Sequence, residues 1–191
     1  MKAETINSVL EVGTDLIIKN GYNNVGLNKI LEAANIPKGS FYYYFKSKED
    51  FGIQVINYYS KNSLTFLNSY LIDNTKQPKE RIISFFEDMK NIYIDKKFKE
   101  GCLLGNCSLE LSDMSQAFSD SVANELNKWQ DCFEKCIQEG QDIKNISNNE
   151  SAKDLSDLIL TSWEGALLRM KSSKNTRSID IFINFLDKYL M

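Results

Sequence analysis

The chain has 191 residues, of which 42% are hydrophobic and 26% are charged, with a net charge of −3. These values exclude a disordered or collagen-like chain and are typical of a globular protein with a sizeable core. The first twenty-one residues have no uninterrupted apolar core, and no window approaches the roughly 18 apolar residues of a membrane span. We therefore expect a cytoplasmic protein without membrane contact.

The residue types present exclude several kinds of catalytic and metal site. Histidine is absent, which excludes Ser-His-Asp and Cys-His catalysis and limits a zinc site to cysteines or carboxylates. The cysteines also lack the close C-x-x-C pairing of zinc sites. There is neither a Gly-rich phosphate loop nor a paired-carboxylate motif. We expect free thiols, no metal, no cofactor and no enzymatic activity. The four cysteines are Cys102, Cys107, Cys132 and Cys136.

The beginning of the chain is predicted to form three short helices followed by a longer one. Apolar residues recur at spacings of three and four, and strict alternation is absent, so we expect an all-α protein. A stripe within residues 6–17 ends at Asn20-Gly21, a common C-terminal stop. A shorter stripe, residues 27–34, precedes a run of aromatic residues. Ser47 is expected to cap the longer helix, whose first turn contains the acidic residues Glu49 and Asp50.

The rest of the chain is predicted to form helices joined by polar segments. Short helices give way to long ones near residue 47, so we expect one domain over residues 1–47 and another over 48–191. Polar stretches at residues 96–101 and 139–151 interrupt the apolar pattern. The apolar stripes between these breaks fall at residues 78–93, 102–112, 118–136, 155–170 and 182–189.

Residues 27–45 have the lengths expected of a helix-turn-helix. A helix at Leu27–Ala34 is followed by a turn at Asn35–Pro37 and a second helix at Lys38–Phe45. Asn35 can adopt the left-handed conformation, Ile36 can fill the angle between the helices, and Pro37 fixes φ where the second helix starts. Residues 1–48 also hold six lysines against four acidic residues, whereas the rest of the chain is acidic.

The aromatic run in the second helix divides into two faces at 100° per residue. Phe41, Tyr44 and Phe45 share one face and are expected to be buried. Four polar side chains point elsewhere, and in a helix-turn-helix they would meet phosphates and bases in the major groove. Gly39 would let the backbone approach DNA closely. An amphipathic helix with solvated tyrosines, in an interaction module without DNA binding, is the alternative. The four side chains are Lys38, Ser40, Tyr42 and Tyr43.

The stretch GYNNVGLNKILEAANIPKGSFYYYFKSKEDF resembles the DNA-binding domain of TetR-family transcriptional regulators. The family pattern has a Gly-aromatic pair after its first helix and a KG-(S/T)-x-Y-x-Y-F-x-(S/N)-K-E run. Three departures occur: Val25 and Gly26 replace frequent Thr or Ser residues, Pro37 replaces a Ser cap, and Tyr43 replaces a frequent His. The resemblance implies DNA contacts by Asn28, Lys29, Lys38, Gly39, Ser40, Tyr42, Tyr43 and Lys48.

The same resemblance implies a larger helical ligand-binding and dimerisation domain after the helix-turn-helix. Family members are homodimers that release operator DNA when a small-molecule inducer binds, so we expect a repressor, with an activator of the same fold as the alternative. The dimer helices would be roughly residues 152–172 and 176–190, and the stripe at residues 155–170 has the width of a packing face. Alternatively, that stripe packs within its own domain. Residues that would line the inducer pocket, or else belong to the plain core, are Phe66, Met89, Tyr93, Cys102, Trp129 and Trp163.

The segment GCLLGNCSLELSD, residues 101–113, is similar to one branch of the family in which some members respond to electrophiles. Gly101 indicates a helix start at Cys102, and a helix N-terminus lowers the pKa of a thiol. A reactive Cys102 is therefore one hypothesis. The other is that Cys102 is a small buried hydrophobic residue.

Overall fold

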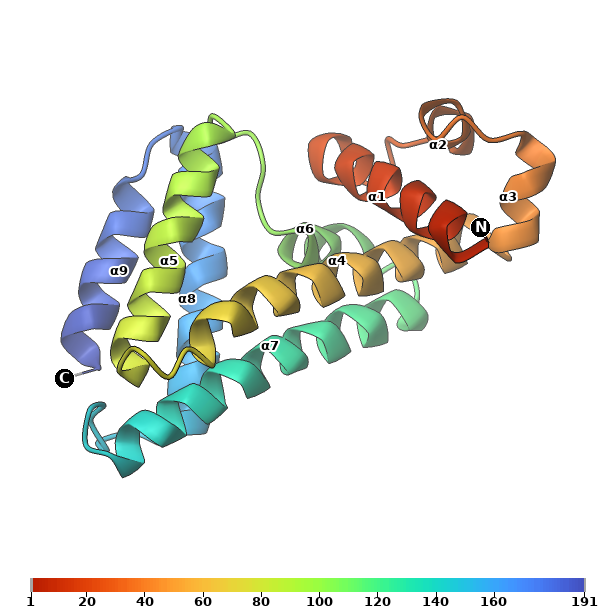
Figure 1. The fold of residues 1–191 in the computed structure, drawn as a ribbon. Helices are drawn as coiled ribbons and strands as arrows, with labels where there is room; N and C mark the ends of the chain where they lie inside the picture. Colours follow the sequence, from red (N-terminus) through yellow and green to blue (C-terminus); the bar gives the residue numbers. More distant parts are fainter. Residues whose placement is uncertain (1, 191) are drawn as a thin grey trace. The chain divides into compact units, whose positions relative to one another are not determined.

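The computed structural model describes residues 2–190, which form nine α-helices and no strand (Figure 1). The all-α prediction is therefore confirmed. No helix in residues 2–190 is long and apolar enough to span a membrane. The helices are α1 (Lys2–Asn20), α2 (Leu27–Ala33), α3 (Lys38–Tyr44), α4 (Lys48–Leu71), α5 (Pro78–Asp95), α6 (Leu103–Leu111), α7 (Gln116–Asp142), α8 (Ala152–Ser173) and α9 (Arg177–Tyr189).

The helices group into two compact units. The first unit comprises the chain up to Ser63 together with Cys102–Leu126, and the second comprises Leu64–Gly101 together with the chain from Asn127 onward. Helices α4 and α7 therefore contribute residues to both units. The first unit contains α1, α2, α3 and α6, so the helix-turn-helix shares a core with a helix that lies far away in the sequence.

An aromatic cluster forms the core beneath α3 in the first unit. The rings of Phe41, Phe45 and Phe51 lie 5.0–5.6 Å apart between centroids, and all three side chains are buried. A Cβ atom at Gly13 of α1 would overlap the Phe51 ring, so glycine lets α1 approach α4 closely. Packing of this kind joins α3 to α4 and fixes which face of α3 stays outside.

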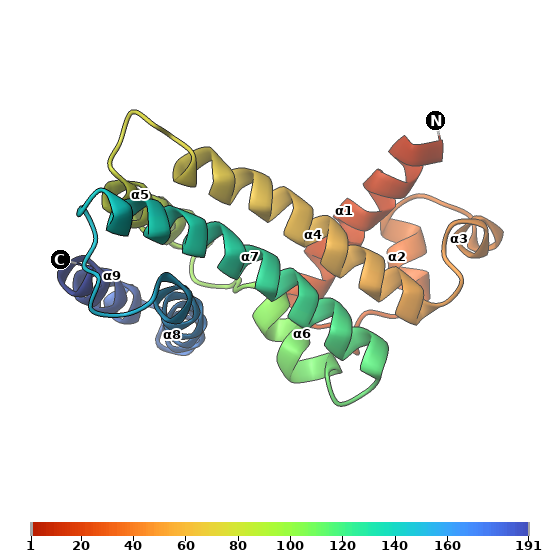
Figure 2. The same cartoon turned by 90° about the horizontal axis from the view of Figure 1, so that it is seen from below.

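A second aromatic cluster, centred on Phe86 of α5, forms the core of the second unit. The Phe86 ring stacks on Phe133 of α7 at 5.5 Å and lies 4.8 Å from both Trp163 and Phe182. Figures 1 and 2 both show α9 lying against α8. These rings hold α5, α7, α8 and α9 together.

The apolar stripe of α8 belongs to this core. Its residues Leu155, Ile159, Trp163, Leu167 and Met170 are buried within their own unit. The inference that this stripe forms a dimer face was therefore wrong, because periodicity reveals an apolar face without revealing what covers it. Leu158, by contrast, remains exposed.

The predicted linker at residues 139–151 begins too early, because α7 continues to Asp142. A Cβ atom at Gly140 would lie 2.6 Å from the side chain of Ile146, so the helix and the following loop pack tightly there. The Gln141 side-chain amide donates hydrogen bonds to the carbonyls of Ser147 and Glu150. The sequence therefore predicted a loop at polar residues that form the last turn of α7. Gln141, one of these residues, holds the following loop by hydrogen bonds.

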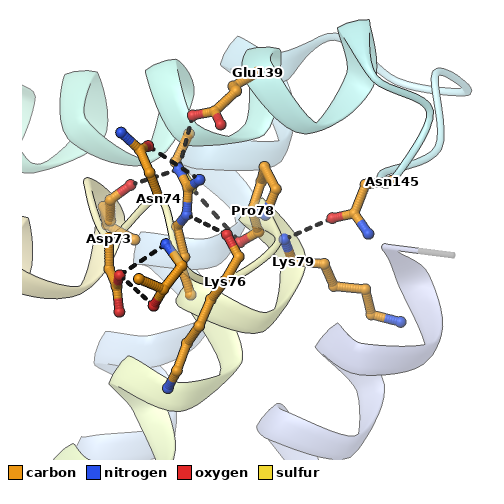
Figure 3. Close-up of polar contacts among 11 residues, drawn as sticks. Asp73, Asn74, Lys76, Pro78, Lys79, Glu139 and Asn145 are labelled. Atoms are coloured by element: carbon orange, nitrogen blue, oxygen red, sulfur yellow. Dashed lines mark hydrogen bonds and ion pairs between the residues drawn. The ribbon is translucent and has the colours of Figure 1, made fainter.

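The α4–α5 turn is held by the buried side chain of Arg81. Figure 3 shows the polar contacts of this turn, with Lys76 and Glu139 labelled. The Arg81 guanidinium donates to the carbonyls of Leu71 and Lys76, at 3.1 and 2.9 Å, and to Glu139 of α7 at 2.8 Å. The ion pair with Glu139 raises the pKa of Arg81 above its ordinary value. One side chain therefore donates hydrogen bonds to two backbone carbonyls of the turn and links the turn to α7.

Candidate nucleic-acid interface

Residues 34–37 form a tight turn between α2 and α3, as predicted. Asn35 adopts the left-handed conformation, with φ of 51°. Its N–H donates to the Glu32 carbonyl at 3.1 Å, and the Ile36 N–H donates to the Leu31 carbonyl at 3.0 Å. This pair of bonds is a Schellman motif, which ends a helix at a left-handed residue. Pro37 then has the extended backbone of an N-cap, and α3 begins at Lys38.

Helix α3 has one buried face and one exposed face. Phe41 and Phe45 are buried in the aromatic cluster, whereas the side chains of Tyr42 and Tyr43 are 60% and 67% exposed. Tyr44, which was expected to be buried, is half-buried. The short helix therefore presents two adjacent tyrosines outward while phenylalanines anchor its other side.

The exposed face of α3 also includes Lys38 and Gly39. A Cβ atom at Gly39 would have no neighbour within 4 Å, so packing within the chain does not require glycine there. Glycine in a helix is less favourable than alanine by roughly 0.5–1 kcal/mol. An exposed helical glycine without a packing role is consistent with close approach of another molecule to the backbone.

The remaining expected DNA contacts differ in their surroundings. Asn28 and Lys29 of α2 are exposed, and Ser40 is half-buried. The departures before α2 are also explained, because Val25 is fully buried while Gly26 is the N-cap of α2 with open space around it. Val25 fills the core, so a hydroxyl at that position would face the core.

Lys48 interacts with its own unit. Its Nζ donates to the Tyr22 carbonyl at 3.1 Å and lies 4.4 Å from the centroid of the Tyr22 ring. Burial lowers the pKa of Lys48, and the nearby Glu110 carboxylate opposes that effect. Lys46, which follows the aromatic run just beyond α3, is exposed instead.

Comparison with known proteins identifies the family to which this helix-turn-helix belongs. Residues 9–53 match the model described as bacterial regulatory proteins of the tetR family, and residues 78–186 match the tetracyclin repressor-like C-terminal domain. The chain belongs to the TetR family. It is therefore a DNA-binding transcriptional regulator and not an enzyme.

Relatives of this TetR-family chain include named regulators. It is 34% identical to the HTH-type transcriptional repressor DhaR of Mycobacterium sp. (strain GP1), over 96% of this chain and 90% of the relative. It is 31% identical to the transcriptional regulator AcuR of Cereibacter sphaeroides, over 86% of this chain and 75% of the relative. The crystal structure of a regulatory protein TetR from Rhodobacter sphaeroides superposes with a TM-score of 0.90 at 28% identity, covering 96% and 97% of the two chains.

The residues proposed to line an inducer pocket in this TetR-family chain fall into both units. Tyr93 and Trp163 pack together in the second unit at 6.2 Å, and Phe66 contacts Phe85 at 6.0 Å. Trp129 is buried in the same unit, and Met89 is half-buried there. Cys102 belongs to the first unit. Tyr93, Trp163 and Trp129 are thus parts of the packed interior.

The cysteines of this TetR-family chain are free thiols, as expected. Cys102 is the N-cap of α6, which confirms the predicted helix start, but its side chain is only 4% exposed. Burial raises the pKa of Cys107 and of Cys136 to about 12, so these two thiols are protonated at neutral pH. Cys132 is half-exposed, and burial raises its pKa as well.

Proposed function

We propose that this TetR-family chain is a dimeric repressor that binds double-stranded operator DNA with α3 and leaves it when a small-molecule inducer binds. The observation that carries the proposal is α3 itself, whose exposed face holds Lys38, Gly39, Tyr42 and Tyr43 over a buried phenylalanine face. A recognition helix contacts base edges through its early residues. Phosphate contacts come from lysines and hydroxyls of the same region.

The proposal gives each of the two predicted domains a role. Residues 1–47 would form the DNA-binding domain, and residues 48–191 the ligand-binding and dimerisation domain. Asn28, Lys29 and Ser40 would add DNA contacts around α3. Lys48 would contribute less than its position in the family pattern implies, because its ammonium group is already hydrogen-bonded to Tyr22. A repressor that binds operator DNA would act in the cytoplasm.

Fluorescence anisotropy with DNA from the upstream region of its own gene tests the central claim. The purified protein is titrated with excess random competitor across a series of salt concentrations. Specific binding at about 10⁻⁸–10⁻¹¹ M, weakening steeply as salt rises, is expected. If neither this DNA nor selection from genomic fragments gives binding tighter than to random DNA, the proposal is wrong.

A dimer face on α8 and α9 is supported by an exposed apolar surface. Ile181, Phe185 and Tyr189 lie at spacings of four on the exposed side of α9, and Phe185 is 59% exposed. Beside them runs a groove that includes Gly165 and Arg169 of α8. A Cβ atom at Gly165 would have no neighbour within 4 Å, so a second helix could approach closely there. Large side chains next to small ones suit interdigitation with the same face of a second copy.

Sedimentation analysis of Phe185→Glu tests this dimer face. The wild-type chain is expected to sediment as a dimer, and the variant as a monomer, because a buried unpaired carboxylate opposes association. Ile143→Glu makes the same kind of change at an exposed apolar residue of the α7 end and should leave the dimer intact. A wild-type monomer, or a dimer that tolerates Phe185→Glu, contradicts the assignment.

Release by an inducer requires a ligand that distinguishes two conformations. Shifting a population from about 1:99 to 99:1 needs roughly 10⁴-fold preferential binding. The candidate lining residues within the second unit remain Phe66, Met89, Tyr93, Trp129 and Trp163, and substitutions among them should change inducer response more than operator affinity. A reporter gene separates repressor from activator, since deletion of the regulator raises expression only for a repressor.

A thiol-reactive inducer is a second proposal, supported by the position of Cys102 at the N-cap of α6. Backbone N–H groups at a helix start stabilise a thiolate. Alkylation of the native protein, followed by mass spectrometry, compares Cys102 with Cys132. Exposure alone would favour the half-exposed Cys132, so faster labelling of Cys102 would indicate activation. If Cys102 reacts no faster than Cys132, this proposal fails.

A further inference from the structure

The turn between α1 and α2 is held by a carboxylate from α6, far away in the sequence. Glu110 lies in the last turn of α6. Its Oε2 accepts a hydrogen bond from the Tyr22 N–H at 2.9 Å, and its Oε1 accepts one from the Asn23 N–H at 2.6 Å. Hydrogen bonds from backbone N–H groups to a carboxylate are shorter and stronger than those between neutral groups. One side chain therefore holds two consecutive backbone amides.

The backbone of this turn is shaped to receive the carboxylate. Gly21 follows α1 with φ of +80°, a backbone conformation that residues with a side chain rarely adopt. A Cβ atom at Gly21 would lie 3.1 Å from Oε2 of Glu110, so glycine also leaves room for the carboxylate. Successive N–H groups that follow a left-handed residue form an anion-binding concavity. In this chain the anion is supplied by Glu110 itself.

Tyr22 is held at its other groups as well. Its carbonyl accepts from Nζ of Lys48, and its ring packs edge-on against Phe118 at 5.2 Å. A Cβ atom at Gly52 would lie 2.6 Å from the Tyr22 ring, so the ring is seated closely on α4. Tyr22 therefore connects α4, α6 and α7 at one point of the first unit.

The turn that contains Tyr22 connects α1 to α2, the first helix of the helix-turn-helix. Helix α2 begins at Leu27, five residues after Tyr22, and packs against α1 and α3. A change at the Tyr22 backbone is thus passed through a short connection to the helix-turn-helix. Glu110 itself is half-buried, and no carboxylate oxygen of it needs to touch DNA for this effect.

We propose that Glu110 is a positioning residue for DNA binding, which sets the orientation of the helix-turn-helix by holding the Tyr22 and Asn23 amides. The inference rests on the proposed operator binding. Without the carboxylate, the turn keeps its hydrophobic contacts but loses its charge-assisted bonds. The helix-turn-helix would then sample a wider range of orientations, and operator affinity would fall.

The test compares Glu110→Gln with Asp113→Asn, an exposed acidic residue just beyond α6. Both variants remove one negative charge, which by itself favours binding to a polyanion. Glu110→Gln is nevertheless expected to weaken specific binding about tenfold, within the usual range of couplings between sites. Asp113→Asn should bind as tightly as the wild type or more tightly. Affinity for random DNA should not fall in Glu110→Gln, and should change as it does in Asp113→Asn, because phosphate contacts alone carry it.

A spacing series gives a readout that simple destabilisation would not change. Operators are lengthened and shortened between half-sites by single base pairs. Wild-type protein should prefer one spacing, and Glu110→Gln should discriminate less between spacings. Equal affinity and equal spacing preference in the variant and the wild type would overturn the inference, whereas a wild-type protein that binds no operator would overturn the proposed function instead.

Hydrogen exchange covers the case in which Glu110→Gln does not fold. In wild-type protein the amides of Tyr22 and Asn23 should exchange slowly, because the carboxylate accepts both of them. Neighbouring amides of the same loop, such as that of Asn24, should exchange faster. Exchange of Tyr22 and Asn23 at the rate of an open turn would show that Glu110 does not hold them in solution.

Discussion

Two turns in this molecule are each held by one charged side chain, which comes from the following helix in one turn and from a distant helix in the other. Arg81 donates to two carbonyls of the α4–α5 turn and pairs with Glu139, while Glu110 accepts from two amides of the α1–α2 turn. Arg81 is only 3% exposed, whereas Glu110 is half-buried. The chemistry is complementary, yet the surroundings differ.

That difference separates a role in stability from a role in positioning. Water cannot reach the buried site of Arg81. If Arg81 were substituted, the two carbonyls to which it donates would therefore lose their hydrogen-bond donor. Glu110 is half-buried and Asn23 is exposed, so water can replace part of what the carboxylate provides, and the loss of Glu110 costs less stability. The α1–α2 turn, however, leads into the DNA-binding helices. We therefore expect Arg81 substitutions to change the free energy of unfolding and Glu110 substitutions to change operator affinity.

Arg81→Met should have the largest effect on stability. Methionine keeps much of the side-chain length but none of the donors, so the Leu71 and Lys76 carbonyls and Glu139 lose their partner. The free energy of unfolding should fall by about 3 kcal/mol. Urea denaturation followed by circular dichroism measures it, and operator affinity per folded molecule should not change.

Lys79→Met is the matched control for Arg81→Met. Lys79 pairs with the exposed Asp187 at 3.0 Å, and such pairs contribute under about 1 kcal/mol. If Arg81→Met and Lys79→Met are equally mild, the Arg81 contacts do not stabilise the fold in the way that their burial implies.

Lys38→Ala should have the next largest effect, this time on binding. Lys38 is exposed at the first position of α3, and an alanine there leaves the aromatic core unchanged. Loss of one phosphate contact should weaken binding to all DNA sequences and reduce the slope of log K against log salt by about 1. Lys153→Ala removes the same charge from an exposed position of α8 and should leave that slope unchanged. Equal slopes for Lys38→Ala and the wild type would exclude a phosphate contact.

Local chemistry made much of the fold predictable. Asn20-Gly21, Asn35 and Ser47 mark helix ends that the structure confirms. Each acts within a few residues of its own position, so a sequence window contains the whole interaction. The two faces of α3 were predictable for the same reason, because helical periodicity alone separates Phe41 from Tyr42 and Tyr43.

Interactions between distant segments were not predictable from one sequence. The bonds from Glu110 to Tyr22 and Asn23 cross 88 and 87 residues, and no local pattern announces them. The α8 stripe shows a related limit, since its period revealed an apolar face but not that the face packs within its own unit. The bond from Lys48 Nζ to the Tyr22 carbonyl, which spans 26 residues, was likewise not predictable from a local pattern.

Gly39→Ala should have the smallest effect on stability and separates folding from binding by sign. Open space surrounds the Cβ position, so alanine fits within α3 and should raise the free energy of unfolding by about 0.5–1 kcal/mol. If the α3 backbone approaches DNA closely at Gly39, the added methyl group obstructs it and operator binding weakens although the protein becomes more stable. Thermal unfolding and anisotropy on the same preparation measure both quantities. A more stable variant with unchanged operator affinity would show that DNA does not approach α3 at Gly39, and the contact surface would then shift toward Tyr42, Tyr43 and Lys46.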